Sequence, residues 1–155
     1  MATMIKFRVW DKVKKVMMVP RDMQTDSDGN IFYVEAMGPD GEYDEGDLDV
    51  FKFEQFTGLK DVNGKDIYEG DIVQYSYQFY EDLFTGAIVR ETGYIGTVVK
   101  NNGAFGILIN RMSYTDAHCN YYHAKDFVPF CEFDDPESDM ALKGNVHENP
   151  ELLEG

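Results

Sequence analysis

The chain has 155 residues, of which 29 are Asp or Glu and 14 are Lys or Arg, so its formal net charge is −15 at pH 7. This length suits one domain, or one domain with a small companion, and no apolar run approaches the ~20 residues that span a bilayer. The acidic balance disfavours general binding to nucleic-acid phosphates, which draws its affinity from Lys and Arg. With two cysteines and no apolar signal-peptide core, the chain is expected to keep reduced thiols in the cytoplasm.

The N-terminal segment predicts a β-hairpin. In Ile5–Trp10, three aliphatic or Phe side chains alternate with Lys, Arg and Trp, which is typical of a strand with one apolar face. A turn over Asp11–Lys15 and a return strand over Val16–Val19 follow, and Pro20 is expected to end that strand.

A calcium loop and a hairpin turn compete for the next segment. Asp26, Asp28 and Glu35 have the spacing of three EF-hand positions around the turn residue Gly29. Gln24 stands where the first carboxylate is usual, and the residues that follow have strand character. The preferred interpretation is therefore an Asp-Gly hairpin turn between strands, with no calcium.

The segment Met37–Asp49 is rich in Gly, Pro, Asp and Glu, which predicts a loop or a mobile insertion. Residues 26–54 hold ten acidic side chains and the single basic residue Lys52. This charge favours solubility, basic partners or cations.

The stretch Phe56–Val73, FTGLKDVNGKDIYEGDIV, predicts a hairpin and the entry into a barrel. Val62–Lys65 contains Asn-Gly, which is typical of a two-residue hairpin turn. Glu69–Asp71 breaks the chain again, and the Asp71 carboxylate is expected to accept backbone N–H groups. A strand begins at Ile72.

Three blocks of the sequence resemble, in order, the YopX family of phage and prophage proteins. They are Ile5–Asp11, the stretch Phe56–Val73, and Gly144–Leu153. The resemblance implies a phage setting and a C-terminal part similar to an SH3-type barrel. The family's function is unassigned, so the resemblance supplies no catalytic residues.

The middle of the chain predicts further hairpins. Gln78–Gly86 is expected to form a long loop, and Ala87–Arg90 and Tyr94–Lys100 two separate strands. Asn101–Gly103 is a strong turn signal, after which Ala104–Ile109 returns as a strand.

The last third predicts edge elements and a docked tail. Phe127–Phe133 has the character of a buried strand that Pro129 confines to an edge or a bulge. Pro136 suits the first position of a short helical turn, and Met140–Val146 is expected to close the sheet. In the terminal turn Asn149–Leu153, Asn is expected to cap and the two leucines to pack.

One group of residues has metal-ligand chemistry: Asp116, His118, Cys119, His123 and Cys131. Their spacing fits none of the paired Cys-x-x-Cys patterns of structural zinc sites. In a strand, adjacent His and Cys would also point to opposite faces. We therefore assign no metal, no cofactor and no catalytic residue.

These patterns predict a mainly β protein. Residues 1–53 form a small N-terminal β segment with an acidic loop, residues 54–148 a C-terminal SH3-like barrel, and residues 149–155 a tail.

The function expected from the sequence is a non-catalytic phage accessory protein that binds a host or phage protein, with self-association as a further option. The alternative is a role around nucleic acids. Direct binding would need a basic patch, and mimicry of DNA would need the acids of residues 40–49 at phosphate-like spacing. An enzyme using His118 and His123 is least favoured. The candidate basic patch consists of Lys6, Arg8, Lys12, Arg90, Lys100 and Arg111.

Overall fold

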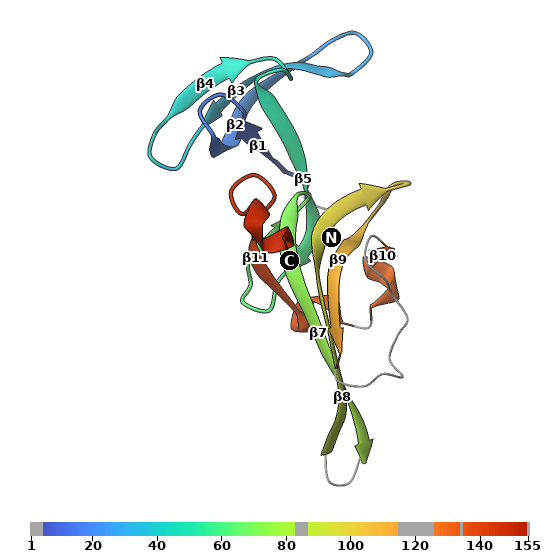
Figure 1. The fold of residues 1–155 in the computed structure, drawn as a ribbon. Coiled ribbons are helices and arrows are strands. Elements are labelled where there is room, and N and C mark those ends of the chain that lie inside the picture. Colours follow the sequence, from blue (N-terminus) through green and yellow to red (C-terminus); the bar gives the residue numbers. More distant parts are fainter. Residues whose placement is uncertain (1–4, 83–86, 115–125, 134, 155) are drawn as a thin grey trace. The chain divides into compact units, whose positions relative to one another are not determined.

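The structure, a computed structural model, describes residues 5–82, 87–114, 126–133 and 135–154 (Figure 1). It is mainly β, as the sequence predicts, and its strands form two antiparallel sheets. Residue contacts divide the chain into two compact units, Met1–Gly58 and Leu59–Gly155. The sequence-based boundary lies a few residues earlier, before Glu54. In the described part of the chain, no helix is long and apolar enough to cross a membrane.

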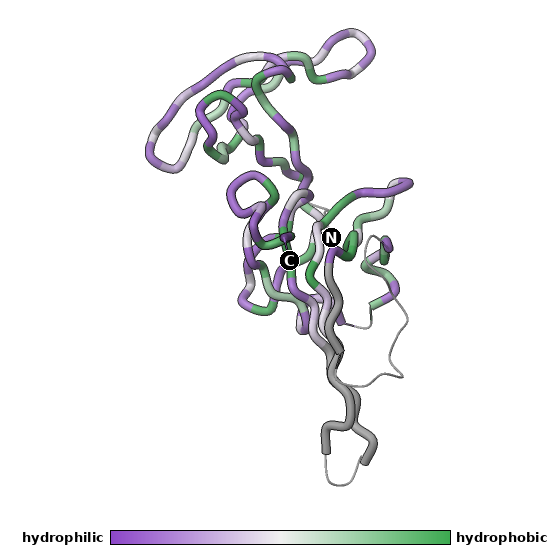
Figure 2. The backbone as a smooth tube through the Cα atoms, in the orientation of Figure 1, coloured by the Kyte–Doolittle hydropathy of each residue, from purple (hydrophilic) through white to green (hydrophobic). Residues whose placement is uncertain are grey.

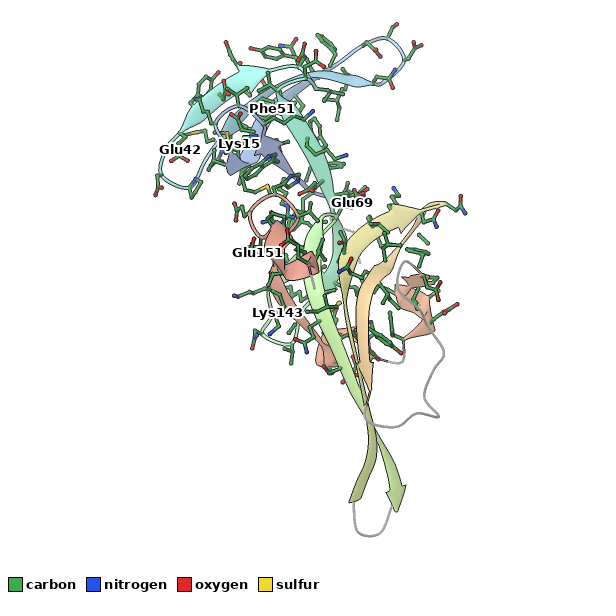
Figure 3. The ribbon with its side chains drawn as sticks, in the orientation of Figure 1. Lys15, Glu42, Phe51, Glu69, Lys143 and Glu151 are labelled. Atoms are coloured by element: carbon green, nitrogen blue, oxygen red, sulfur yellow. The ribbon has the colours of Figure 1, made fainter. Side chains whose placement is uncertain are left out.

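The first unit is built from strands with one apolar side. Its inward side chains form a core of Val9, Met18, Val34, Ala36 and Phe51, the last labelled in Figure 3. The strand order of the sheet is β4-β3-β2-β1-β5-β6, of which β5 continues past Gly58 and β6 belongs to the second unit. The strands are β1 (Phe7–Asp11), β2 (Val16–Thr25), β3 (Ile31–Met37), β4 (Tyr43–Gly46), β5 (Phe51–Lys60) and β6 (Asp66–Tyr68).

Two predictions for the first unit are wrong. Pro20 does not end β2: it pairs with Ala36, and the strand continues past a β-bulge between Pro20 and Asp22, where the register shifts. The loop predicted for Met37–Asp49 contains β4, which pairs with β3.

The second unit holds a five-stranded sheet in the order β10-β9-β8-β7-β11. Its core lies on one side of the sheet and includes Ile67, Tyr75, Val98, Ile107 and Met140. The remaining elements are β7 (Asp71–Asp82), β8 (Ala87–Asn101), β9 (Ala104–Tyr114), β10 (Phe127–Pro129), the 3₁₀ turn η1 (Phe130–Glu132), the helical turn α1 (Pro136–Asp139), β11 (Met140–Asn145) and the 3₁₀ turn η2 (Pro150–Leu153).

The strong turn signals are confirmed, with one change. Asn102 and Gly103 both have positive φ, 51° and 84°, as the tight hairpin between β8 and β9 requires. Between β5 and β6 only Gly64 has positive φ, and Asp61 and Lys65 close a wider turn than the two-residue turn predicted.

Three strand boundaries differ from prediction. Gln78–Asp82 extends β7 where a loop was predicted, and the two strands predicted between Ala87 and Lys100 are one strand. Phe130–Glu132 is a 3₁₀ turn, although Pro129 does lie on an edge strand. In the first two cases the long β7–β8 pairing outweighs the local turn tendency of residues such as Gly93.

The end of the chain is docked within the second unit. The Asp135 side chain accepts the N–H of Ser138 and caps α1. Asn149 does not cap η2 with its side chain; its Oδ1 instead accepts the N–H of Asn145. The Asn110 side chain donates to the carbonyl of Leu153, which holds the tail.

Candidate functional site

The structure describes one of the five residues with metal-ligand chemistry. Asp116, His118, Cys119 and His123 lie outside the described residues, and Cys131 is a free, exposed thiol at η1. Within the described ranges, no group of three or more His, Cys, Asp or Glu side chains could hold a metal ion.

The segment around Gly29, considered above as a possible calcium loop, forms a hairpin turn. Asp26 Oδ1 accepts the backbone N–H groups of Asp28 and Asn30, each at 2.9 Å, and Gly29 has φ 85°. The N–H of Asn30, with further N–H donors, holds the pKa of the Asp26 carboxyl below its ordinary value. The carboxylate therefore stabilises the turn between β2 and β3.

The basic residues considered for nucleic-acid contact have partners inside their own units. The Arg8 guanidinium forms an ion pair with Glu54 at 2.9 Å, and Lys12 donates to the carbonyl of Leu48. Lys6 and Lys100 lie over the rings of Phe56 and Phe105. The side chains of Arg90 and Arg111 are outside the described part.

Strand register places three exposed apolar side chains side by side in the first unit. Val19 on β2 pairs with Met37 on β3, which pairs with Tyr43 on β4. Because directly paired residues point to the same side of a sheet, the three form one row. Their exposed fractions are 55%, 37% and 50%. Burying such a row against another molecule would stabilise the complex in proportion to the apolar area removed from water.

A row of acidic residues runs beside the apolar row. Asp22 on β2 pairs with Glu35 on β3, which pairs with Glu45 on β4. Like charges directly opposite each other destabilise a sheet. No ion pair among the described residues includes these acids or Arg21, the nearest basic residue along β2.

Two tyrosines fix the acid at the end of this row. The Tyr43 hydroxyl donates to Oε2 of Glu45 at 2.9 Å, and the Tyr33 hydroxyl also bonds the same carboxylate. These bonds raise the pKa of Tyr33 and of Tyr43 to about 12 and hold the pKa of Glu45 below its ordinary value. Glu45 is therefore a charged acceptor in a defined orientation.

We call this surface the acidic–apolar face; it consists of Val19, Asp22, Tyr33, Glu35, Met37, Tyr43 and Glu45. The opposite side of β3 carries the buried core residues Val34 and Ala36. The tips of the two hairpins that bound these strands are hydrophilic (Figure 2).

The acidic–apolar face was missed at the sequence level because β4 was assigned to a loop. One usable signal was present. Pro39-Asp40-Gly41 is typical turn chemistry, and it stands between β3 and β4. Gly41 adopts φ 85° in this turn, and Gly38 donates its N–H to the carbonyl of Glu42.

Two carboxyl groups meet near the core of the same unit. Asp11 is fully buried, its Oδ1 accepts the N–H groups of Val13 and Lys14, and its Oδ2 accepts no donor from the described residues. The Asp44 carboxyl lies near that of Asp11, and the two groups affect each other's protonation. The hydrogen bond to Asp11 raises the pKa of Asp44. Burial alone would raise the pKa of Asp11, but the bonds from Asp44, Lys14 and Val13 outweigh burial and lower it.

Side chains also occupy polar backbone groups of β4, the edge strand. Lys14 donates its ammonium to the carbonyl of Tyr43, and Asp44 Oδ1 accepts the N–H of Glu45. Capping of this kind protects an edge against the addition of another strand. A partner is therefore expected on the exposed side of the sheet and not at its edge.

The second unit has a groove of about 400 Å³ beside β7 and β11. Its lining is of mixed polarity, with Gln74 and Ser76 from β7 and Lys143, labelled in Figure 3, from β11. Asp139 is the other charged residue of the lining. Ser138 also lines the groove, and its hydroxyl donates to Oδ2 of Asp135 at 2.7 Å within the α1 turn.

The fold and this face define a class: a two-unit, antiparallel β protein that presents an exposed acidic and apolar sheet surface. The family model described as YopX protein matches residues 6–154, so the chain belongs to the YopX family, as its sequence resemblance predicted. A solved structure titled "Crystal structure of protein EF1440 from Enterococcus faecalis" is similar, with a TM-score of 0.53 and 21% identity. The match covers 99% of this chain and 100% of that one. It indicates a shared fold. A search of curated proteins found no match.

Proposed function

We propose that this YopX-family chain is a non-catalytic phage or prophage protein that acts in the host cytoplasm by binding another protein through the acidic–apolar face. The observation that carries the proposal is the exposed row Val19, Met37 and Tyr43, which register alone places together. Large adjacent apolar side chains on an otherwise charged surface are typical of a protein-binding site.

We also propose an SH3-like barrel for the second unit. Its strand order is that of such barrels: the last strand, β11, lies next to the first, β7, and the meander β7-β8-β9-β10 continues from there. A 3₁₀ turn stands between β10 and β11, where SH3-type barrels have one. The fold supplies a scaffold, and the function is argued from the face on the first unit.

The test is affinity purification of the tagged protein from nuclease-treated host lysate, followed by mass spectrometry. The wild type should retain one dominant protein at near-equal stoichiometry. The double variant Val19→Ser, Met37→Ser should lose it, because the apolar contact area is removed. Val13→Ser is the matched control, since Val13 is exposed in the β1–β2 turn of the same unit but outside the face.

Circular dichroism and thermal unfolding establish that each variant is folded. Retention of the same protein by the double variant would refute the face as the binding surface. Recovery of the protein alone, with a multiple of its mass in light scattering, would point to self-association instead.

Mimicry of DNA is a second candidate, favoured by one observation. The acids of the acidic–apolar face stand on strands with fixed spacing, and Glu45 belongs to the segment for which a loop was predicted. If the retained protein binds DNA, competition by duplex DNA for the complex would support mimicry, and indifference to DNA would exclude it.

A further inference from the structure

We infer that the partner presents an amphipathic helix to the acidic–apolar face, with an apolar stripe against Val19, Met37 and Tyr43 and a flank of Lys or Arg against Asp22, Glu35 and Glu45. This inference rests on the proposed function and adds the chemistry and shape of the segment that is bound.

Charge complementarity indicates that the bound segment of the partner is positively charged. Between Asp22 and Asp49 the chain has ten acidic residues and no Lys or Arg. Three of these acids stand opposite one another in one row, at a cost to the sheet. Basic side chains from a partner would relieve this repulsion, whereas an acidic segment or an anionic lipid surface would increase it.

The orientation of Glu45 supports recognition of a specific group. Its carboxylate is held by the hydroxyls of Tyr33 and Tyr43, so little side-chain freedom is lost when a cation binds. Tyr43 takes part in both rows: its exposed ring belongs to the apolar row and its hydroxyl bonds the acid.

The spacing of the rows favours a helix over a strand. Each row crosses β2, β3 and β4, and neighbouring strands in a sheet lie ~4.8 Å apart. A helix repeats one side every ~5.4 Å along its axis, while an extended strand repeats every ~6.8 Å. On β3 and β4 the two rows are two residues apart, about 7 Å, and on β2 the bulge makes the interval three residues. This separation suits a basic flank beside an apolar stripe on one helix.

The capped edge disfavours the main competing mode of recognition. Strand addition would need the outward backbone groups of β4, but the carbonyl of Tyr43 and the N–H of Glu45 are already bonded to the side chains of Lys14 and Asp44.

The test uses synthetic helical peptides labelled with fluorescein and measured by fluorescence anisotropy. The first peptide has a Leu stripe flanked by Lys. A second has Glu in place of Lys, and a third has the composition of the first in scrambled order. The first peptide should bind, more weakly as salt is added, and the other two should bind at least about tenfold more weakly.

Matched variants distinguish an effect of charges on the acidic–apolar face from an effect of the net charge of the protein. Asp22→Asn with Glu35→Gln should weaken binding of the Lys peptide about tenfold. Asp28→Asn with Asp40→Asn changes the net charge equally at turns outside the face, and should change binding less than about twofold.

Equal weakening by the two acidic pairs, or equal binding of the scrambled or Glu peptide, would overturn the inference. The proposed function fails separately, if Val19→Ser with Met37→Ser still retains the cellular partner. Loss of the partner in that variant, with no preference for the Lys peptide, would keep the function and reject the basic helix.

Discussion

At the residue scale, the Asp61 side chain joins two elements of the second unit. It is 4% exposed, its Oδ1 accepts the N–H groups of Asn63 and Lys65, and its Oδ2 accepts the N–H of Leu142 at 3.0 Å. One carboxylate thus closes the β5–β6 turn and joins it to β11. Burial by itself would raise the pKa of this carboxyl, but the three N–H donors outweigh burial and lower the pKa.

We expect Asp61→Asn to lower the free energy of unfolding by about 1–3 kcal/mol at pH 7, because an amide NH₂ must replace one acceptor in a buried site. Urea unfolding followed by circular dichroism measures this change. Asp28→Asn, at an exposed turn, is the control for the altered charge and should have little effect.

The pH dependence of the same variant has a defined sign. Because the folded-state pKa of Asp61 is lowered, its contribution is full above the unfolded value of about 3.9 and is lost as the pH falls through the folded value. The difference between wild type and Asp61→Asn should therefore shrink below about pH 4. A difference that stayed constant in acid would mean that the carboxylate charge has no part in it.

At the scale of elements, the sequence predicted well those turns and strand edges that one or two residues with special backbone chemistry determine. Asn102-Gly103 formed its tight turn, and Pro129 marked an edge strand. The Asp71 carboxylate accepts the N–H of Tyr68, as expected for a turn before a strand. In each case the local chemistry of one or two residues determines the conformation.

Elements that depend on distant partners were not predictable in the same way. The exposed side of β2–β4 exists because β4 pairs with β3, and only the register puts Asp22, Glu35 and Glu45 in one row. Likewise the full length of β7 and β8 follows from their mutual pairing. Composition alone therefore could not predict the acidic–apolar face, although the turn residues before Tyr43 could have indicated its last strand.

The pairing of β9 with β10 depends on the absence of a side chain at Gly106. A Cβ there would lie 2.3 Å from the carbonyl of Val128 and 2.8 Å from the ring of Phe127. We expect Gly106→Ala to push β10 away from β9 and to cost about 1–3 kcal/mol of stability.

Amide hydrogen exchange can localise this effect. The N–H of Ile109, which donates to the carbonyl of Asp126, should exchange faster in Gly106→Ala, while amides of the first unit keep their rates. Unchanged protection at Ile109 would show that β10 tolerates the methyl group and that its packing against Gly106 is looser than the distances indicate.

At the scale of the whole molecule, the two units have separate cores. Phe51 belongs to the apolar cluster of the first unit and Met140 to that of the second, and the two clusters share no residue. Both side chains are buried, with exposed fractions of 1% and 0%. Stability should therefore be distributed over two regions that respond separately to core substitutions.

This separation predicts the outcome of a double-mutant cycle. Phe51→Ala should cost about 3–5 kcal/mol and Met140→Ala about 2–5 kcal/mol, because each leaves a cavity in a packed cluster. Since the clusters share no residue, hydrogen exchange monitored by mass spectrometry should show faster exchange in residues 5–58 for the first variant and in residues 59–154 for the second. The losses of protection should add in the double variant within about 0.5 kcal/mol. A coupling well above that value would mean that the strand β5, which runs through the boundary at Gly58, transmits the loss of packing from one unit to the other.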